Sequence, residues 1–235
     1  MVDTKTMPAK TRIACIIFIS RNILVIKCTK FLYFESMKIL FATQNQNKVE
    51  EVHDLLPKGF EILGLEHFNF TMEIPETQST IEGNAIQKVN FVFDLLKIDC
   101  FAEDTGLIVP SLGGEPGVFS ARYGGPERDP LKNMEKLLAK LNGKNSREAY
   151  FETVIALRFG NRLETFVGHC HGHIALESAG DGGFGYDPIF IPNGYDESFA
   201  QLSKAVKNQI SHRANAIAKL ISFLLDHHSI SGVAQ

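Results

Sequence analysis

The order of strands and helices constrains the fold of this sequence more than any other feature. A short apolar strand over residues 38–42 leads through a polar loop into a helix whose apolar residues recur at helical spacing. Residues 148–159 and 162–177 have the aromatic and β-branched content of two long strands, joined as a hairpin at Gly160 and Asn161. This combination of a strand–helix unit with a hairpin predicts an α/β fold with a mixed sheet, rather than a repeated βαβ array.

A capping box predicts a further helix after the first strand. Ser79 and Glu82 have the spacing of such a box, and a stripe of apolar residues follows them as far as Leu96. Asn84 and Lys88 lie one turn apart on this stretch. They could face a ligand, although solvated positions are the commoner fate of such residues.

Two later helices have equally clear starts. Asp129 followed by Pro130 is typical of a helix N-terminus with proline in the first turn. Ser211 is the expected N-cap of the last helix, which would place His212 and Arg213 in its first turn. Residues at that position face whatever anion or polar edge lies at the helix end.

Two adjacent carboxylates are the first candidates for chemistry. Glu103 and Asp104, followed by Thr105 and Gly106, come at the end of a predicted buried strand. Mg²⁺ prefers near-octahedral oxygen ligands and usually takes one or two carboxylates together with substrate phosphates. The pair therefore suggests chemistry on a phosphorylated substrate, and a polar strand terminus is the simpler alternative.

Two loops are candidates for holding such a substrate. Residues 43–48 lie at a helix N-terminus, where free backbone N–H groups favour phosphate and Lys48 adds a positive charge; a simple N-cap by Asn45 or Asn47 is the alternative. Residues 180–188 are too glycine-rich for regular structure and contain two aromatic side chains. They suit a loop folded around a flat base, or a tight connection whose aromatic residues fill the core.

The charge distribution argues against a nucleic-acid polymer as partner. Residues 1–36 hold six of the 24 Lys and Arg residues but two of the 27 Asp and Glu residues, so the remainder has 18 basic against 25 acidic side chains, a net charge of minus seven. Such a body has no bulk field that attracts nucleic acid. An anionic ligand must then be held by local basic groups, helix N-termini or a metal ion.

The first 36 residues are expected to form an N-terminal extension. Residues 13–34 are apolar, but three Lys or Arg residues interrupt them, so the longest uncharged run is shorter than the ~20 residues of a membrane span. A targeting segment is an alternative, without a clear small-residue cleavage site. We expect the domain to comprise residues 37–235 and the extension to be dispensable or an over-extended reading frame. Loss of activity in a chain starting at Met37 would contradict this.

Cysteine usage indicates a reducing compartment, and we expect the cytoplasm. The four cysteines lie far apart and form no C-x-x-C pair. His169, His171 and His173 alternate along a predicted strand and would share one face. Because no further ligand accompanies them at a familiar spacing, a zinc site is the less favoured interpretation.

Six short motifs follow one another between about residues 37 and 225. They are Thr43-x-Asn45-x-x-Lys48, Glu103-Asp104-Thr105-Gly106, Leu112-Gly113-Gly114-x-Pro116-Gly117, Ser120-Ala121-Arg122-Tyr123, Phe184-Gly185-Tyr186-Asp187-Pro188 and Ser211-His212-Arg213. Together they resemble the inosine triphosphate pyrophosphatase family. The resemblance implies an elongated mixed sheet flanked by helices, two lobes with a central active-site cleft, Mg²⁺ dependence and a homodimer. Gln44 departs from the glycine that the family commonly has there, and would crowd this loop.

The resemblance also implies residue roles. Asp104 would be the base that orients or deprotonates water, and it would bind Mg²⁺ together with Glu76, with Glu73 as the alternative ligand. Phe184 would stack on the purine. The other implied substrate contacts are Thr43, Gln44, Asn45, Gln46, Asn47, Lys48, Thr105, Gly185, Tyr186, Asp187, Lys207, His212 and Arg213.

The implied reaction is Mg²⁺-dependent hydrolysis of ITP, dITP and XTP to the nucleoside monophosphate and pyrophosphate. Two alternatives stay open: a nucleotide pyrophosphatase of broader specificity, and a nucleotide-binding sensor without turnover. Turnover of ITP and XTP no faster than that of ATP would favour the first. Equal rates for the wild type and Asp104→Asn would favour the second.

Overall fold

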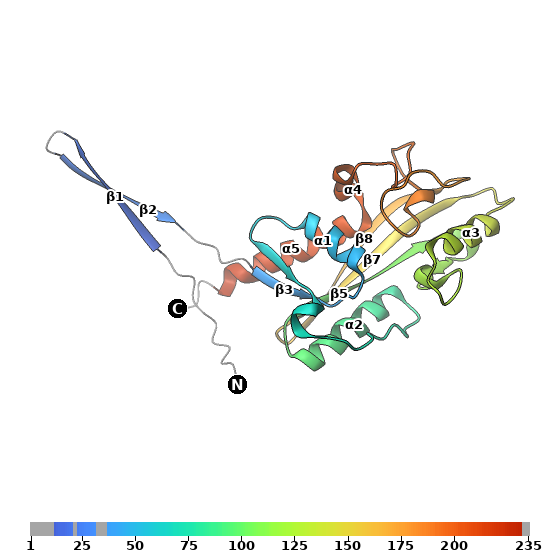
Figure 1. The fold of residues 1–235 in the computed structure, drawn as a ribbon, viewed down its shortest axis with the longest axis horizontal. Coiled ribbons are helices and arrows are strands. Elements are labelled where there is room, and N and C mark those ends of the chain that lie inside the picture. Colours follow the sequence, from blue (N-terminus) through green and yellow to red (C-terminus); the bar gives the residue numbers. More distant parts are fainter. Residues whose placement is uncertain (1–11, 21–22, 32–36, 232–235) are drawn as a thin grey trace.

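The computed structural model describes residues 12–20, 23–31 and 37–231. Its main body is a seven-stranded sheet in the order β4-β3-β5-β7-β8-β9, with β6 paired to β5 (Figure 1). The strands are β3 (Met37–Phe41), β4 (Phe60–Leu63), β5 (Cys100–Ile108), β6 (Pro116–Gly117), β7 (Glu148–Phe159), β8 (Arg162–Ile174) and β9 (Phe190–Pro192). The α-helices of this described part are α1 (Gln46–Leu55), α2 (Ile81–Leu96), α3 (Pro130–Lys140), α4 (Lys204–Ile210) and α5 (His212–Ser231).

The sheet is mixed, as predicted. Strand β3 runs parallel to β4 and β5, whereas β7 is antiparallel to both β5 and β8. The β7–β8 hairpin turns at Gly160, whose φ of 56° lies in the left-handed region that favours glycine. The predicted α/β class, with a mixed sheet flanked by helices, is therefore confirmed.

Alternation along β5 explains how the helices cover both faces of the sheet. Phe101 packs in one core cluster with Val52 of α1 and Ile217 of α5, whereas Ala102 packs in another with Val89 of α2. Figure 1 shows α5 and α2 on either side of these strands. Successive residues of a strand point to opposite faces of the sheet. Glu103 and Asp104, the next two residues of β5, therefore also face different helices.

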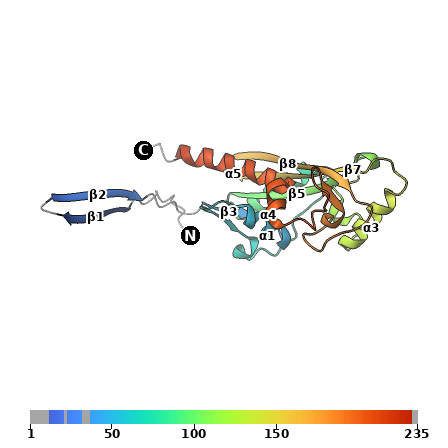
Figure 2. The same cartoon turned by 90° about the horizontal axis from the view of Figure 1, so that it is seen from above.

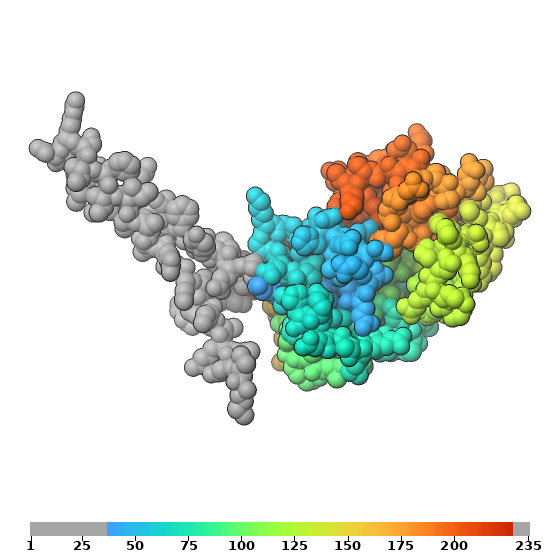
Figure 3. Space-filling view, in the orientation of Figure 1, coloured from blue at the N-terminus to red at the C-terminus, as the bar shows by residue number. Residues whose placement is uncertain are grey.

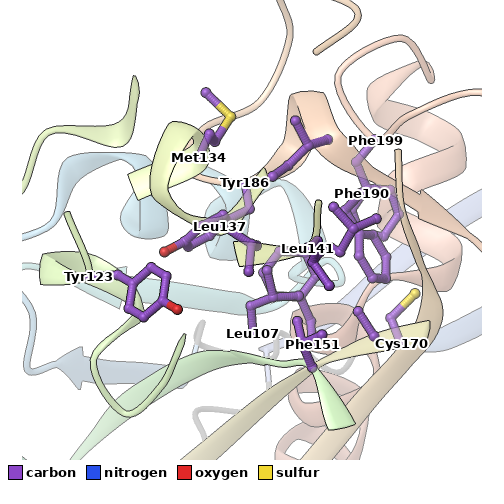
Figure 4. Packing of buried hydrophobic residues seen from close by; sticks show 14 residues of the cluster. Leu107, Tyr123, Met134, Leu137, Leu141, Phe151, Cys170, Tyr186, Phe190 and Phe199 are labelled. Atoms are coloured by element: carbon purple, nitrogen blue, oxygen red, sulfur yellow. The ribbon is translucent and has the colours of Figure 1, made fainter. Parts of the chain in front are cut away.

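A third core supports the other end of the sheet, beside α3 (Figure 4). Leu107, Phe151 and Phe190 of the strands pack there with Leu137 and Leu141 at the end of α3. Burial of one such side chain contributes about 1.5–3 kcal/mol. Both ends of the sheet therefore have apolar support of their own.

Two local predictions are wrong. Helix α2 is capped by Thr80, whose hydroxyl accepts the N–H of Gly83, and not by Ser79. Glu103 and Asp104 lie in the middle of β5 and not at its end. The strand continues through both carboxylates because cationic side chains on each face neutralise them.

Two strands were not predicted in the N-terminal segment. Strands β1 (Arg12–Ser20) and β2 (Ile23–Phe31) form a two-stranded antiparallel sheet of their own, apart from the main sheet (Figure 2). No helix in the described ranges is both long and apolar enough to cross a bilayer.

Candidate active site

A cavity of about 510 Å³ opens between the two lobes. Figure 3 shows this hollow between the blue segment that contains α1 and the yellow-green segment that contains α3. Its lining comes from the loop after β3, the segment before α2, the middle of β5, the turn before α3, the loop before β9 and the start of α5. The volume is in the range of small-ligand sites.

Glu103 is the centre of an ionic network on the α5 side of β5. Its carboxylate accepts hydrogen bonds from Nε and Nη2 of Arg213 at 3.0 and 2.9 Å, and Nζ of Lys48 lies 3.2 Å away. The Glu103 side chain is fully buried. Burial acts to raise the pKa of Glu103, but the two cations overcome it and lower that pKa to about 2. Glu103 is therefore ionised and positions the cations.

Asp104 faces α2 instead. Its carboxylate accepts hydrogen bonds from Nδ2 of Asn84 at 3.2 Å and from Nζ of Lys88 at 2.9 Å. The same ammonium donates to Oε1 of Glu76 at 2.8 Å. Asn84 and Lys88 are buried, so the solvated position considered more common does not apply here. Burial opposes the charge of Lys88, but the two carboxylates raise its pKa overall, and it remains a cation.

A second network joins α1 to α4 and α5. Lys207 donates at 2.6 Å to Oε1 of Glu51 and to Oδ2 of Asp187. Glu51 also accepts a hydrogen bond from Arg213. Burial raises the pKa of Asp187 in spite of this ammonium. The network fixes the start of α5 against the loop that contains Asp187.

The loop before β9 is held by a tight turn. The N–H of Phe184 donates to Oδ2 of Asp187 at 2.8 Å, and Gly183 has a φ of 68°. A Cβ at Gly183 would lie 2.0 Å from that carboxylate oxygen, so the turn requires glycine. The ring of Phe184 lies 5.4 Å from Nζ of Lys207 and 5.6 Å from Cζ of Arg213. It borders the cavity beside two cations.

Tyr186 anchors this loop to the other wall. Its hydroxyl donates to the carbonyl of Ser120 at 2.9 Å, and its ring belongs to the core cluster of Figure 4. Both aromatic residues of the loop line the cavity, and Tyr186 is also part of the core. Its ring therefore fills the core as the second interpretation expects, whereas a loop folded around a flat base stays a prediction.

His212 contributes a neutral ring to the same end of the cavity. It is buried and stacks on Phe151 with 4.6 Å between ring centroids. Burial lowers the pKa of His212 well below its usual value, and Arg213 lowers it further. Its Nδ1 has no hydrogen-bond partner among the residues that the structure describes. A neutral imidazole offers one donor and one acceptor to a polar ligand.

The structure brings almost every predicted site residue to this cavity. The lining includes Thr43, Gln44, Asn45, Asn47, Lys48, Glu76, Asp104, Thr105, Phe184, Gly185, Tyr186, Asp187, Lys207, His212 and Arg213. Gln46 begins α1 and does not line it. Asn45 is the N-cap and accepts the N–H of Lys48, whereas Gln44 donates to the carbonyl of Met72.

Five lining or supporting residues were absent from the predicted site: Glu51, Asn84, Lys88, Arg122 and Arg128. The sequence spacing placed Asn84 and Lys88 on one helix face. It did not show that both contact Asp104, which lies on a strand sixteen or more positions away. Glu51 lies three positions after Lys48 on α1, so the spacing predicts that both side chains lie on one face of that helix.

The donor set fits a hard divalent cation. Oxygens of Glu76 and Asp104 already converge on one positive charge, the ammonium of Lys88. Burial acts to raise the pKa of Glu76, but Lys88 lowers that pKa overall. The Glu76 carboxylate is therefore ionised and can ligate a cation. Within the described ranges no three His, Cys, Asp or Glu side chains form a metal-binding group. Two carboxylates are what Mg²⁺ commonly takes, with water and phosphate completing the shell.

Glu103 should make stability depend on acid pH. Its pKa is lowered from 4.5 to about 2, so its contribution is complete above pH 4.5 and is lost as the pH falls toward 2. We expect the free energy of unfolding in urea to fall by up to about 3 kcal/mol across this window. Glu103→Gln should lack this part of the pH dependence. An equal pH dependence in both proteins would contradict the assignment.

The fold and the site together define a two-lobed α/β enzyme with an ionic cleft. A model of the Ham1 family matches residues 39–223. The dITP/XTP pyrophosphatase of Flavobacterium psychrophilum is 49% identical over 187 residues, which cover 80% of this chain and 98% of that protein. The dITP/XTP pyrophosphatase of Bacillus subtilis is 43% identical over 189 residues, covering 79% and 96%.

Solved structures agree with these sequence relatives. The structure of the Staphylococcus aureus Ham1 protein has a TM-score of 0.74 and 40% identity, and the match covers 81% of this chain and 100% of that one. The chain belongs to the Ham1 family. This membership confirms the resemblance drawn from the six motifs.

Proposed function

We propose that this protein hydrolyses the non-canonical purine nucleoside triphosphates ITP, dITP and XTP to the nucleoside monophosphate and pyrophosphate. One observation carries the proposal: a single cavity is lined by the ring of Phe184, the carboxylate of Asp104 and several cationic side chains, Lys88 among them. A purine, a reacting phosphate and further phosphates need these three kinds of group. The two relatives are named dITP/XTP pyrophosphatases, which supports dITP and XTP among these substrates.

The base would bind at the end formed by Phe184 and His212. Stacking on an aromatic ring contributes about 1–3 kcal/mol per base and accepts any purine. Selectivity then rests on hydrogen bonds to the base edge, for which Asp187, His212 and Arg213 are the nearest groups. A site built to pair with one polar group can reject its replacement by up to about 10⁴-fold, so a 6-amino purine would be disfavoured where a 6-keto oxygen is recognised.

Asp104 would act on the attacking water. The water oxygen forms a bond to the α-phosphorus, the bond from that phosphorus to the bridging oxygen breaks, and the water proton passes to the carboxylate of Asp104. Hydrogen bonds from Asn84 and Lys88 fix the orientation of this carboxylate. Mg²⁺ held by Glu76 and Asp104 would supply charge neutralisation for the triphosphate.

The phosphates nearest Asp104 would meet the loop after β3. The N-terminus of α1 directs backbone N–H groups and its dipole toward this part of the cleft, and Lys48 adds a cation. Burial lowers the pKa of Lys48, and Glu103 opposes that shift. Thr43 and Asn45 lie on the same loop as further polar contacts.

Residues 37–235 would carry the whole activity, in a cytoplasmic homodimer that needs neither nucleic acid nor a membrane. The family match within residues 39–223 supports this boundary, and so does the coverage of nearly the full length of the relatives.

The decisive experiment is pyrophosphate release from ITP, dITP, XTP, ATP and GTP, with Mg²⁺ and with a chelator, by the full chain and by a chain starting at Met37. We expect Mg²⁺-dependent release from ITP, dITP and XTP at least about 10²-fold faster than from ATP. Equal rates for ATP would indicate a broader pyrophosphatase. Nucleotide binding without any release would indicate a sensor.

A further inference from the structure

We propose that Arg122 and Arg128 bind the distal phosphates of the substrate and the pyrophosphate that leaves. This inference rests on the proposed function and names the groups that serve the end of the substrate farthest from the base. Neither arginine belonged to the predicted site, and both line the cavity.

Both guanidinium groups face Glu76 without a close hydrogen bond to it. Nη1 of Arg122 lies 3.9 Å and Nη2 of Arg128 lies 3.8 Å from the same carboxylate oxygen, Oε2. These are the acidic contacts that the structure gives the two side chains within the described residues. Their N–H donors are therefore still available to a ligand.

Arg122 is also held in place without using those donors. Its guanidinium lies 5.2 Å from the ring centroid of Phe119, in a cation–π arrangement. Phe119 itself is 55% exposed, so this ring lies at the surface beside the guanidinium. The ring orients the guanidinium toward the cavity and leaves its N–H edges free.

Arg128 has an uncommon backbone conformation for its type. Its φ is 56°, in the left-handed region that residues with a Cβ rarely adopt. Glycine would suit this backbone conformation better, so an arginine at this position carries a conformational cost. Such outliers concentrate at ligand sites.

The order of contacts along the cleft gives the arginines their role. From Phe184 the contacts pass through Arg213 to Thr105, the neighbour of Asp104 in β5. Beyond Asp104 they continue through Lys88 and Glu76 to the two arginines. A nucleotide with its base on Phe184 and its α-phosphorus at Asp104 must extend its remaining phosphates toward the far end of this series. Fork-shaped guanidinium groups are well matched to phosphate oxygens.

The test compares binding of the two products. Inorganic pyrophosphate with Mg²⁺ and inosine monophosphate are each titrated by calorimetry into the full chain, and into Arg122→Gln, Arg128→Gln and Lys132→Gln. Lys132 is the matched control, because it is an exposed cation near Arg128 that pairs with Glu127 and does not line the cavity. We expect each arginine variant to lose about tenfold or more in pyrophosphate affinity. Affinity for the monophosphate should change less than about twofold in all variants.

A variant with a relaxed backbone separates binding from folding. Arg128→Gly removes the guanidinium and suits the left-handed conformation, so its thermal midpoint should equal or exceed that of the wild type while pyrophosphate binding is lost. Unchanged pyrophosphate affinity in the arginine variants, or equal losses for both products, would overturn the inference. Product binding is measured independently of turnover, so an inactive wild type would reject the proposed function and still test the arginines.

Discussion

Replacing Asp104 by Asn is expected to lower the rate of pyrophosphate release from ITP by about 10³-fold. The amide has nearly the shape of the carboxylate, but it cannot accept the proton of the attacking water. It also leaves the ammonium of Lys88 with one carboxylate, that of Glu76, in place of two. The measurement is single-turnover release of pyrophosphate with Mg²⁺, with ITP binding followed separately by calorimetry.

Asp94→Asn is the matched control for this change. Asp94 lies on α2, is exposed and pairs with Lys97 at 3.2 Å, so the same loss of one charge occurs outside the cavity. Its rate should equal that of the wild type. If Asp104→Asn also kept the wild-type rate while binding ITP, Asp104 would not be the base.

Arg213→Gln is expected to reduce the free energy of unfolding by about 3–5 kcal/mol. Arg213 is almost fully buried and holds both Glu103 and Glu51. Without it, the fully buried Glu103 carboxylate keeps only Lys48 as a cationic partner among the residues that the structure describes. Urea unfolding at neutral pH, followed by circular dichroism, measures the loss.

Two comparisons isolate the buried charge. Lys38→Gln breaks an exposed pair with Glu61 and should cost about 1 kcal/mol or less. The double variant Arg213→Gln with Glu103→Gln should recover part of the loss, because it removes the carboxylate left without its main partner. A single variant as stable as Lys38→Gln, with no recovery in the double variant, would show that the network does not stabilise the fold.

Elements with local signs were predictable from the sequence. The apolar spacing of α1, the hairpin turn at Gly160 and the cap of α5 at Ser211 all depend on residues within one or two turns of chain. The cap of α2 failed by one position, because Ser79 and Thr80 both have a hydroxyl and spacing alone does not rank them.

The long-range partners of the site were less predictable. Glu103 and Asp104 contact different helices because strand β5 continues through both residues. The apolar run in the sequence ends before Glu103, so it did not predict this continuation. Glu51 meets Lys207 across 156 positions, and Arg128 meets Glu76 through the approach of the two lobes. Such pairs follow from tertiary packing, which no local pattern encodes. The motif order of a known family supplied most of the site in their place.

The two carboxylates of β5 also make the enzyme intolerant of a shift in strand register. Insertion or deletion of one residue before Glu103 would exchange the sides on which the two acids emerge. The acid proposed to activate water would then meet Arg213, and the acid that holds Arg213 would meet Lys88. The arrangement proposed for hydrolysis therefore requires the correct register of β5. A chain that folds with this strand shifted by one residue would lose the strand pairing and the site together.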